Sequence, residues 1–364
     1  MTLDVVLVPP LPCERWVSIE RYVQAIVSGA QGRASIRVTV PPASQPGTTT
    51  GIYRARYREY RALFSGASAP ADIVHIPDQA LAHLADAFAG TPIAVTCHDL
   101  MPLFLEQGAG SRFASWMDRT LLRHSLERMS GAERIITVSE TTRGDVVRLL
   151  DVDPERISVV PNSLHPAYRA IPEPEQRRRL LPPRPRVLSV GRVAPYKNLE
   201  PLFLALARPA LAGASLVRVG EPLTGTQRQL ADRLGVLSRT TELGHVDPRE
   251  LARVYRACDV LAQPSLYEGF GVPLVEAMAC GLPVVCSDGG ALPEVAADAA
   301  IVVPLASDDF PASLAGAIET ILCDRDTAST LCQRGFSHAE RFRPEPVFTR
   351  LLEAYRIAIK EHAS

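Results

Sequence analysis

The sequence predicts an α/β protein with two doubly wound parallel sheets. Short β-branched runs alternate with longer segments of helical periodicity along the whole chain, which is typical of parallel α/β layers. The 364 residues are too many for one ordinary core and suit two domains of roughly 150–180 residues each. Between the halves, the polar stretch 163–186 is punctuated by prolines and rich in arginine, which indicates a domain boundary.

The first half supplies strands and helices in alternation. The predicted strands are 3–8, 35–40, 72–76, 92–97, 134–138 and 157–160. The predicted helices include 17–30, 52–64, 112–130 and 140–150. These elements predict a first domain over residues 1–165.

The second half repeats this alternation. Its predicted strands are 186–190, 215–219, 259–263, 282–286 and 300–303, and its predicted helices are 198–210, 226–234, 248–256, 273–280 and 309–323. We therefore predict a second domain over residues 166–344. Ligands of doubly wound sheets bind beyond the carboxyl ends of the strands, so we expect a site between two facing domains.

Composition excludes several classes of protein. A net charge of −1, with 46% hydrophobic and 22% charged residues, gives no overall field that would attract nucleic acid. No apolar run reaches membrane-spanning length. The N-terminal residues 1–8 lack a basic segment and meet Pro9 and Pro10, so we expect a first strand and not a signal peptide. The expected location is the cytoplasm.

The seven cysteines are scattered, and most stand in apolar runs. No CxxC spacing or Cys/His cluster is present in the sequence. This pattern favours reduced core thiols over a disulfide or zinc framework.

The segment 265–281 carries the strongest chemical signal. It follows a predicted strand and opens a helix, with Pro273 suited to the first helical turn. Gly269 and Gly271 allow the backbone to approach a ligand closely. We expect unpaired N–H groups at the helix start, including that of Leu274, to form an anion site suited to phosphate.

Two carboxylates flank this anion site, Glu268 in the loop and Glu276 in the helix. A phosphate would repel them unless they bind hydroxyl groups, so we interpret them as ligands of a ribose and a sugar. The glycines do not form a GxGxxG motif, which leaves NAD binding with little support. The alternative is a plain turn with two solvated acids.

A second loop, at the end of strand 186–190, carries two cations. Arg192 and Lys197 follow Gly191 there. A departing nucleoside diphosphate gains negative charge, which fixed cations can neutralise. The alternative is an ordinary surface loop with two basic residues.

The spacing of Glu268 and Glu276 resembles the two-glutamate motif of the retaining GT-B glycosyltransferases of family 4, a family that includes bacterial mannosyltransferases. The resemblance implies the GT-B fold, in which two Rossmann-like domains face each other across a cleft, with the final helix 345–364 returning to the first domain. It implies that Glu276 holds the donor ribose and that Glu268 contacts the donor sugar. It further places the backbone of Gly269, Phe270, Gly271 and Leu274 close to the sugar and diphosphate.

Other segments extend the resemblance. Gly191, Arg192 and Lys197 are similar to the family's diphosphate-binding element, and the segment around Val246 resembles the one that cradles the nucleotide base. In the first half, His98 and Asp99 end a strand in a His-Asp-Leu-x-Pro pattern that implies a histidine beside the donor sugar.

Two features of the first half concern the acceptor side. Ser139 resembles the family's strand–serine turn, although a helix N-cap explains it equally. The loop after the first strand lacks the family's glycine pair, so either Arg15 or Ser18 substitutes for it or the loop shapes the acceptor pocket.

A metal-dependent mechanism is not expected. The pairs Asp151–Asp153 and Asp324–Asp326 both lie in predicted turns, away from any phosphate loop. We therefore expect no essential metal and no cofactor.

Two basic segments, 53–61 and 112–134, have two interpretations. Charged helix faces are usually solvated, but such a face could also dock peripherally on anionic lipid at the inner membrane. No nucleic-acid-binding motif accompanies them.

Together these features predict a metal-independent hexosyltransferase that retains anomeric configuration. Its catalytic residues would be Glu268, His98, Arg192 and Lys197. Segments resembling bacterial mannosyltransferases favour GDP-mannose as donor, with a glycan, lipid-linked or small-molecule acceptor. Two alternatives are a sugar-nucleotide epimerase or hydrolase, and a sugar-nucleotide-binding protein without turnover.

Overall fold

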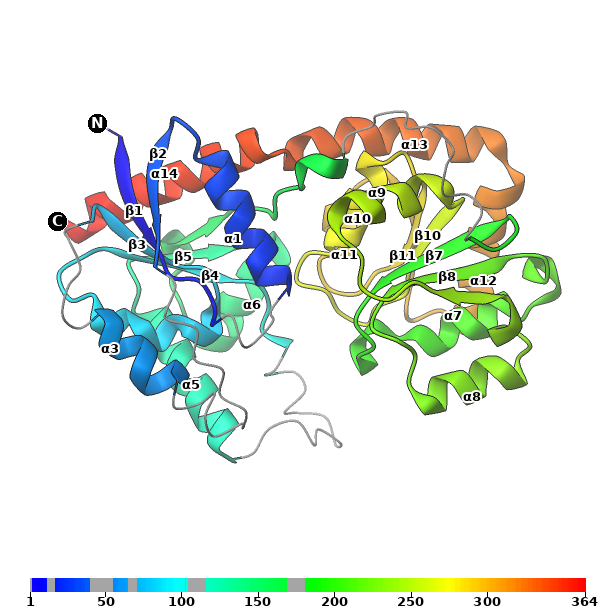
Figure 1. Cartoon of the computed structure of the whole chain (residues 1–364), viewed down its shortest axis with the longest axis horizontal. Helices are drawn as coiled ribbons and strands as arrows, with labels where there is room; N and C mark the ends of the chain where they lie inside the picture. The colour runs from blue at the N-terminus through cyan, green and yellow to red at the C-terminus, as the bar shows by residue number, and fades with distance from the viewer. Residues whose placement is uncertain are drawn as a thin grey trace. The chain divides into compact units, whose positions relative to one another are not determined.

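The computed structural model describes residues 2–11, 17–39, 55–64, 71–101, 103, 116–168 and 181–364. The chain divides into two units, which are drawn in Figure 1. Unit 1 comprises Met1–Ser163 and Pro344–Ser364, and unit 2 comprises Leu164–Arg343. Each unit is built on its own parallel sheet.

The sheet of unit 1 has the strand order β2-β1-β3-β4-β5-β6, and all its pairings are parallel. Because β1 lies between β2 and β3, the direction of winding reverses beside β1, which is the feature that defines a doubly wound sheet. The strands are β1 (Leu3–Leu7), β2 (Ala34–Val38), β3 (Ile73–Ile76), β4 (Ile93–Cys97), β5 (Arg134–Thr137) and β6 (Ile157–Val159).

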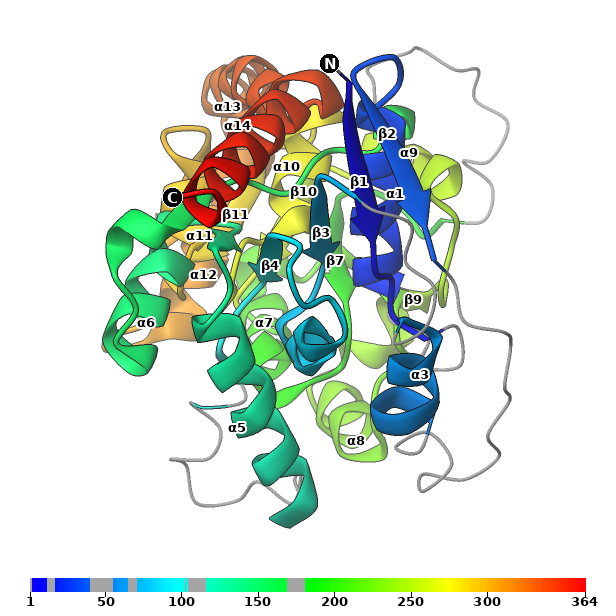
Figure 2. The same ribbon diagram turned by 90° about the vertical axis from the view of Figure 1, so that its left-hand side faces the viewer.

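Helices cover both faces of this sheet, so its strands bury apolar side chains on both sides. Val5 and Leu7 of β1 pack in the core with α1 and α14, whereas Val6 and Val8 pack in the core on the opposite face. Figure 2 shows α3 and α5 below the strands. The helices are α1 (Val17–Gly29), α3 (Tyr60–Phe64), α5 (Trp116–Ser130), α6 (Glu140–Leu150) and α14 (Pro344–His362), with a π-helical turn at Ala55–Glu59 and a 3₁₀ segment at Gln79–Ala87.

Helix α14 joins unit 1 although it follows all of unit 2 in the chain. Its residues Phe348, Leu351 and Tyr355 are buried beside Tyr22 and Ile26 of α1. This packing supplies one side of the unit 1 core from the last segment of the sequence.

The sheet of unit 2 has the order β12-β11-β10-β7-β8-β9, again with parallel pairings. Its winding reverses between β7 and β10, so the loops that follow these two strands leave the same edge at the point where ligands of doubly wound sheets bind. The strands are β7 (Arg186–Gly191), β8 (Ser215–Gly220), β9 (Thr240–Glu242), β10 (Val260–Gln263), β11 (Val284–Ser287) and β12 (Ala300–Val303). The helices are α7 (Leu199–Leu206), α8 (Gly225–Arg233), α9 (Pro248–Ala257), α10 (Val272–Ala279), α11 (Leu292–Ala296), α12 (Phe310–Cys323) and α13 (Arg325–Ala339).

One strand and two α-helices of unit 2, namely β9, the five-residue α11 and α13, were not predicted from the sequence. Strand β9 is a three-residue edge strand of polar side chains, so it carries no apolar pattern. Helix α13 is polar along most of its length and buries only Leu331, Gly335 and Ala339. Neither β9 nor α13 has the hydrophobic periodicity on which sequence-based prediction depends.

No helix among the described residues is long and apolar enough to cross a membrane.

Candidate functional site

The carboxylate of Glu268 is held by three side chains at the carboxyl end of β10. Its Oε1 accepts hydrogen bonds from Lys197 Nζ at 2.6 Å, Gln263 Nε2 at 2.7 Å and Ser265 Oγ at 2.7 Å. Its Oε2 accepts a second bond from Lys197 Nζ at 2.9 Å. The Glu268 and Lys197 side chains are only 11% and 12% exposed, so this charge pair is largely shielded from water.

Lys197 reaches Glu268 because the loops after β7 and β10 are joined by backbone contacts. Leu266 N–H donates to Tyr196 O at 2.7 Å, and Asn198 Nδ2 donates to Pro264 O at 3.0 Å. Asn198 itself has a left-handed backbone (φ 53°) between a 3₁₀ turn and α7. The sequence analysis predicted that Lys197 neutralises the diphosphate and that Glu268 contacts the sugar. The structure brings these two side chains into direct contact.

Two glycines after β11 support the Glu268 loop. A Cβ at Gly289 would overlap the carbonyl oxygen of Ser265, and a Cβ at Gly290 would overlap that of Glu268. Gly290 also has φ +62°, a conformation that favours glycine. Ala291 N–H donates to Glu268 O at 2.9 Å. The Gly-Gly pair, to which the sequence analysis gave no role, therefore lets the backbone pack directly against this loop.

The start of α10 corrects one expectation. Gly271 (φ 91°) forms the N-cap, and proline stands in the first turn as predicted. The N–H of Leu274 is not unpaired, because it donates to Gly271 O at 2.9 Å. The side chain of Phe270 is buried in edge contact with Phe342 at 5.5 Å between ring centroids. The Phe270 side chain therefore stabilises the loop from the core side, and only the backbone of this residue remains a candidate for ligand binding.

Glu276 is 4% exposed on α10 and faces α9. Its Oε2 accepts a hydrogen bond from Tyr255 Oη at 2.8 Å. Burial and the neighbouring carboxylate raise the pKa of Tyr255 well above its usual range, so its hydroxyl keeps its proton and remains a donor. Tyr255 in turn meets Tyr168 edge-on at 6.0 Å between ring centroids.

Arg192 lies in a different environment from Lys197. Its side chain is 74% exposed, and its Nε donates to Glu221 Oε1 at 3.2 Å. The N–H of Val193 donates to the other oxygen of Glu221 at 2.9 Å and, with Arg192, lowers the pKa of that carboxyl. Gly191, with φ +131°, ends β7 and begins this loop.

Val246 lies partly buried in the loop before α9, where Asp247 caps the helix through Arg249 N and Glu250 N. The preceding turn is joined to β8 by a bond from Gly220 N to Gly244 O at 2.8 Å. This loop follows β9 and so leaves the same edge of the sheet as the loops after β7 and β10.

In unit 1, His98 stands one residue past β4. Its Nε2 lies 2.9 Å from Pro77 O, and its backbone N–H donates to Gln79 Oε1 at 3.1 Å. The ring of Tyr22 meets the imidazole edge-on at 4.8 Å between centroids. Burial lowers the pKa of His98 to about 4, so the imidazole is neutral at physiological pH, with Nε2 as its hydrogen-bond donor to the carbonyl.

A buried chain of hydrogen bonds continues from Tyr22. Its hydroxyl lies 3.0 Å from Thr96 Oγ1, which lies 2.8 Å from His75 Nε2. His75 Nδ1 lies 2.7 Å from Tyr355 Oη on α14. Desolvation lowers the pKa of His75 to about 3 and raises that of Tyr22 to about 12. These side chains fix the ring that packs on His98.

The predicted acceptor-side residues have mostly structural contacts. Ser139 is buried and caps α6 through Thr142 N–H at 3.0 Å. Asp99 Oδ1 accepts from Met101 N–H at 3.0 Å in a tight turn. Ser18 is exposed in the first turn of α1. Arg15 lies outside the described residues.

Three of the four acids in the Asp pairs, Asp151, Asp153 and Asp324, cap helix ends. Asp153 accepts from Glu155 N–H at 2.9 Å, and Asp324 accepts from Asp326 and Thr327 N–H at 3.0 and 3.2 Å. Asp151 ends α6 in a left-handed conformation (φ 53°). Asp151 and Asp153 therefore lie in the turn between α6 and β6, as predicted, whereas Asp326 lies in the first turn of α13, a helix that was not predicted.

Only parts of the two basic segments lie among the described residues. There, Arg61 and Arg128 both form ion pairs with Asp86, at 3.9 and 3.3 Å. These exposed contacts do not test the membrane-docking interpretation.

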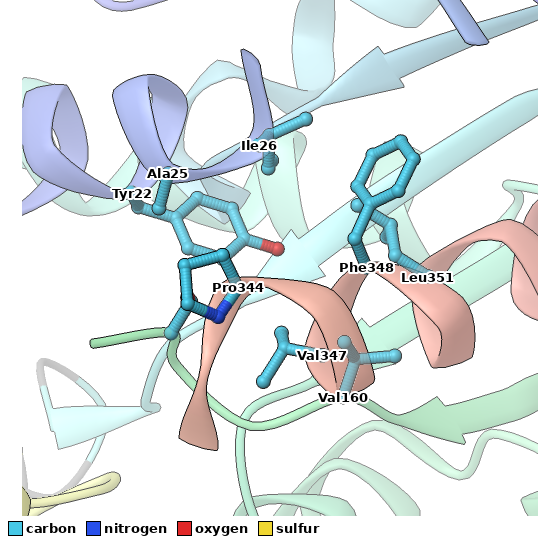
Figure 3. A pocket seen from close by; sticks show the side chains of 9 residues that line it. Tyr22, Ala25, Ile26, Val160, Pro344, Val347, Phe348 and Leu351 are labelled. Atoms are coloured by element: carbon cyan, nitrogen blue, oxygen red, sulfur yellow. The ribbon is translucent and has the colours of Figure 1, made fainter. Parts of the chain in front are cut away.

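A small apolar pocket in unit 1 lies between α1 and α14, where Tyr22, Ile26, Val347 and Phe348 contribute to its lining (Figure 3). Its walls are mostly carbon, so it lacks the polar groups that a sugar or phosphate requires. Its relevance is that it borders the ring of Tyr22, which also contacts His98.

Sequence reasoning missed several polar residues around the unit 2 site. Gln263 and Ser265 hold Glu268, Tyr255 holds Glu276, and the buried Arg218 contacts the Gly191 loop. One signal was available for Gln263 and Arg218, because each is a polar side chain next to apolar neighbours in a buried strand of a parallel sheet.

Comparison with known proteins identifies the family. Residues 172–338 match the model of the glycosyl transferases group 1, and residues 5–163 match that of the glycosyl transferase 4-like domain. The chain belongs to the group 1 glycosyltransferases, and its two parallel sheets have the GT-B fold. The predicted family and the predicted GT-B fold are thereby confirmed.

Curated relatives within this family carry different names. The D-inositol 3-phosphate glycosyltransferase of Segniliparus rotundus is 33% identical over 241 residues, which cover 63% of this chain and 53% of the relative. The alpha-maltose-1-phosphate synthase of Mycolicibacterium smegmatis is 32% identical over 302 residues and 75% of each chain. The O-antigen chain mannosyltransferase B of Escherichia coli is 32% identical over 244 residues, 64% of this chain and 62% of the relative. The match thus spans about half the length of the first relative.

Solved structures share the fold at lower identity. HepE of Anabaena, crystallised with UDP and glucose, superposes with a TM-score of 0.73 at 20% identity and covers 96% of this chain and 98% of its own. WaaG, a glycosyltransferase involved in lipopolysaccharide biosynthesis, gives a TM-score of 0.67 at 17% identity and covers 97% of this chain and 99% of its own.

Proposed function

We propose that this protein is a retaining hexosyltransferase that moves a hexose from a nucleoside-diphosphate sugar to an acceptor hydroxyl. The observation that carries the proposal is the Lys197–Glu268 pair with its supports Gln263 and Ser265. An ammonium group and a carboxylate, side by side at the switch point of a doubly wound sheet, suit a ligand that is anionic at one end and hydroxylated at the other.

Glu268 is suited to bind a sugar hydroxyl. Within the described part of the chain, Oε1 accepts three hydrogen bonds and Oε2 accepts one, from Lys197. Oε1 is therefore fully engaged, whereas Oε2 keeps a lone pair and is the atom that would accept a hydroxyl of the donor sugar. The donors on Oε1 also stabilise the ionised form that this role requires.

Lys197 and Arg192 would neutralise the leaving diphosphate. A phosphate that approaches Lys197 competes with Glu268 for the ammonium protons, and Arg192 has to leave its exposed contact with Glu221. Negative charge that develops as the glycosidic bond breaks would then meet two cations. The leaving phosphate itself would accept the proton of the acceptor hydroxyl, since none of the described residues of the proposed site is an evident general base.

Glu276 would bind the ribose of the donor. Tyr255 orients the Glu276 carboxylate, because its hydroxyl donates a hydrogen bond to Glu276 Oε2 at 2.8 Å. An oriented carboxylate can accept hydrogen bonds from adjacent hydroxyls, which is the geometry that a ribose diol offers. The backbone near Val246 would contact the base.

For the donor we propose GDP-mannose, with a glycan, lipid-linked or small-molecule acceptor. The relation to a mannosyltransferase of O-antigen chains supports this choice, whereas HepE, a structural neighbour, was crystallised with UDP-glucose. We propose that no metal or cofactor is essential, that His98 contacts the donor sugar, and that any membrane contact is peripheral at the inner surface.

The test begins with thermal shifts against GDP, UDP, ADP and their sugars. Stabilisation by GDP and GDP-mannose above the others is expected, and stabilisation by none of them would refute the proposal. Transfer is then measured with and without EDTA, and the anomeric configuration of the product is read by NMR. Conversion of the donor without an acceptor would favour the epimerase or hydrolase instead, and binding without turnover would favour a sensor.

A further inference from the structure

Arg218 is a buried cation beneath the Gly191 loop. It lies near the middle of β8, only 2% exposed, among the apolar residues Leu216, Val217 and Val219 of the strand. Its Nη1 donates to Ser189 Oγ at 3.0 Å, and its Nη2 donates to Gly191 O at 3.0 Å and to Glu221 O at 3.4 Å. Its hydrogen bonds within the described part of the chain therefore go to a hydroxyl and two carbonyls, not to a carboxylate.

The two carbonyls belong to the strand ends that carry Arg192 and its partner. Gly191 and Gly220 are paired at the ends of β7 and β8, and a Cβ on Gly220 would overlap Gly191 O. Carbonyl oxygens carry partial negative charge, so at this edge they would repel a phosphate. The guanidinium of Arg218 donates hydrogen bonds to one carbonyl at each strand end, that of Gly191 after β7 and that of Glu221 after β8.

The same contacts determine where the anion-facing groups lie. Glu221, whose carbonyl Arg218 contacts, binds Arg192 Nε and Val193 N–H through its carboxylate. Burial lowers the pKa of Arg218 to about 10, against the opposing effect of Glu242 and Glu221. The guanidinium thus stays charged at neutral pH.

We propose that Arg218 is a positioning residue for the diphosphate of the donor. It joins the ends of β7 and β8, offsets the carbonyl charge at this edge and holds the Arg192 loop in the shape that accepts an anion. The inference rests on the proposed function, because it assumes that the loop after Gly191 binds diphosphate.

Arg186 offers a matched control. It is the other deeply buried arginine of the same sheet, at the amino end of β7, and it donates to the carbonyls of Pro182 at 2.6 Å and Ala257 at 3.0 Å. Replacement of either arginine leaves carbonyls without a donor, so both changes lower stability. Only Arg218 lies at the edge where the diphosphate would bind.

The experiment compares R218M, R218K and R186M in the full chain. Calorimetry measures the Kd of GDP and GMP, or of UDP and UMP if the wild-type protein binds those instead, and melting temperatures report stability. We expect R218M to weaken diphosphate binding about tenfold and monophosphate binding by much less. R218K, which keeps the charge but cannot span both carbonyls, should lose about threefold, and R186M should melt earlier with unchanged affinities.

Several results would overturn the inference. The first is that R218M binds the nucleoside diphosphate as tightly as the wild type does. The second is that R218M loses as much affinity for the monophosphate as for the diphosphate. The third is that R186M loses as much diphosphate affinity as R218M does. If R218M does not fold, R218K decides: unchanged diphosphate affinity in this variant rejects the positioning role. A wild-type protein that binds no nucleoside diphosphate would instead refute the proposed function itself, and the inference with it.

Discussion

Replacement of Glu268 by glutamine tests the central pair of the site. The side chain keeps its shape, and its amide oxygen can replace Oε1 as acceptor for Lys197, Gln263 and Ser265. Its amide nitrogen then replaces Oε2, which accepts from Lys197 Nζ at 2.9 Å. Two donors would face each other there, and the lysine would lose its counter-charge.

The magnitude follows from burial. Hydrogen bonds to charged groups contribute about 1.5–3 kcal/mol, and side chains 11% and 12% exposed leave little solvent to screen the pair. For a unit of this size, about 2 kcal/mol lowers the melting temperature by roughly 4–8 °C. The loss of a fixed acceptor for a sugar hydroxyl, together with a displaced Lys197, should lower kcat about 100-fold.

The assay measures transfer and donor hydrolysis at saturating donor, with melting temperature in parallel. Asp259→Asn is the control. Asp259 accepts a hydrogen bond from Arg186 N–H at 2.7 Å and forms an ion pair with Arg184 at 3.0 Å, at the amino ends of the strands of the same sheet. This substitution should lower stability and leave kcat unchanged. If Glu268→Gln melts early but transfers at the wild-type rate, Glu268 is a structural residue and the assignment fails.

Three further predictions concern the supports of the site and pH. Tyr255→Phe removes the donor that orients Glu276 and should weaken nucleoside diphosphate binding about fivefold by calorimetry; unchanged affinity would remove the ribose role. Gly290→Ala forces a Cβ onto the carbonyl oxygen of Glu268 and should lower both melting temperature and kcat, whereas Gly225→Ala, where a Cβ meets nothing within 4 Å, should change neither. His75 has a pKa lowered from 6.5 to about 3, so its unfolded form takes up a proton before the folded form does. Stability is then fully present above pH 6.5 and is lost as pH falls toward 3. Melting temperatures across this range should show the loss in the wild type and less of it in His75→Gln, and identical profiles would contradict the assigned pKa.

The sequence was informative where periodicity and local spacing decide the structure. Buried strands such as β4 and β10 are mostly apolar runs, with one polar residue each, and the helix at Pro273 begins where proline and glycine predict. Strand β9 was missed because a short polar edge strand is defined by its neighbour β8 and not by its own residues.

Contacts between distant residues could not be read from the sequence. Lys197 and Glu268 are 71 positions apart, and only the strand order that places β7 beside β10 brings them together. The expectation that the Leu274 N–H is unpaired was wrong for a related reason. This N–H donates to the carbonyl of Gly271, a contact that depends on the backbone conformation of the turn and not on residue spacing. The buried partners of His98 likewise come from separate segments, since Tyr22 lies on α1 and Pro77 follows β3.

Helix α14 has a consequence for biosynthesis. The core of unit 1 includes Phe348, Leu351 and Tyr355, which the ribosome adds only after all of unit 2 has been made. During translation, the apolar face of the N-terminal sheet that α14 covers therefore stays without this helix while unit 2 is synthesised. Although unit 1 is synthesised first, its core can be completed only after the whole chain has been made.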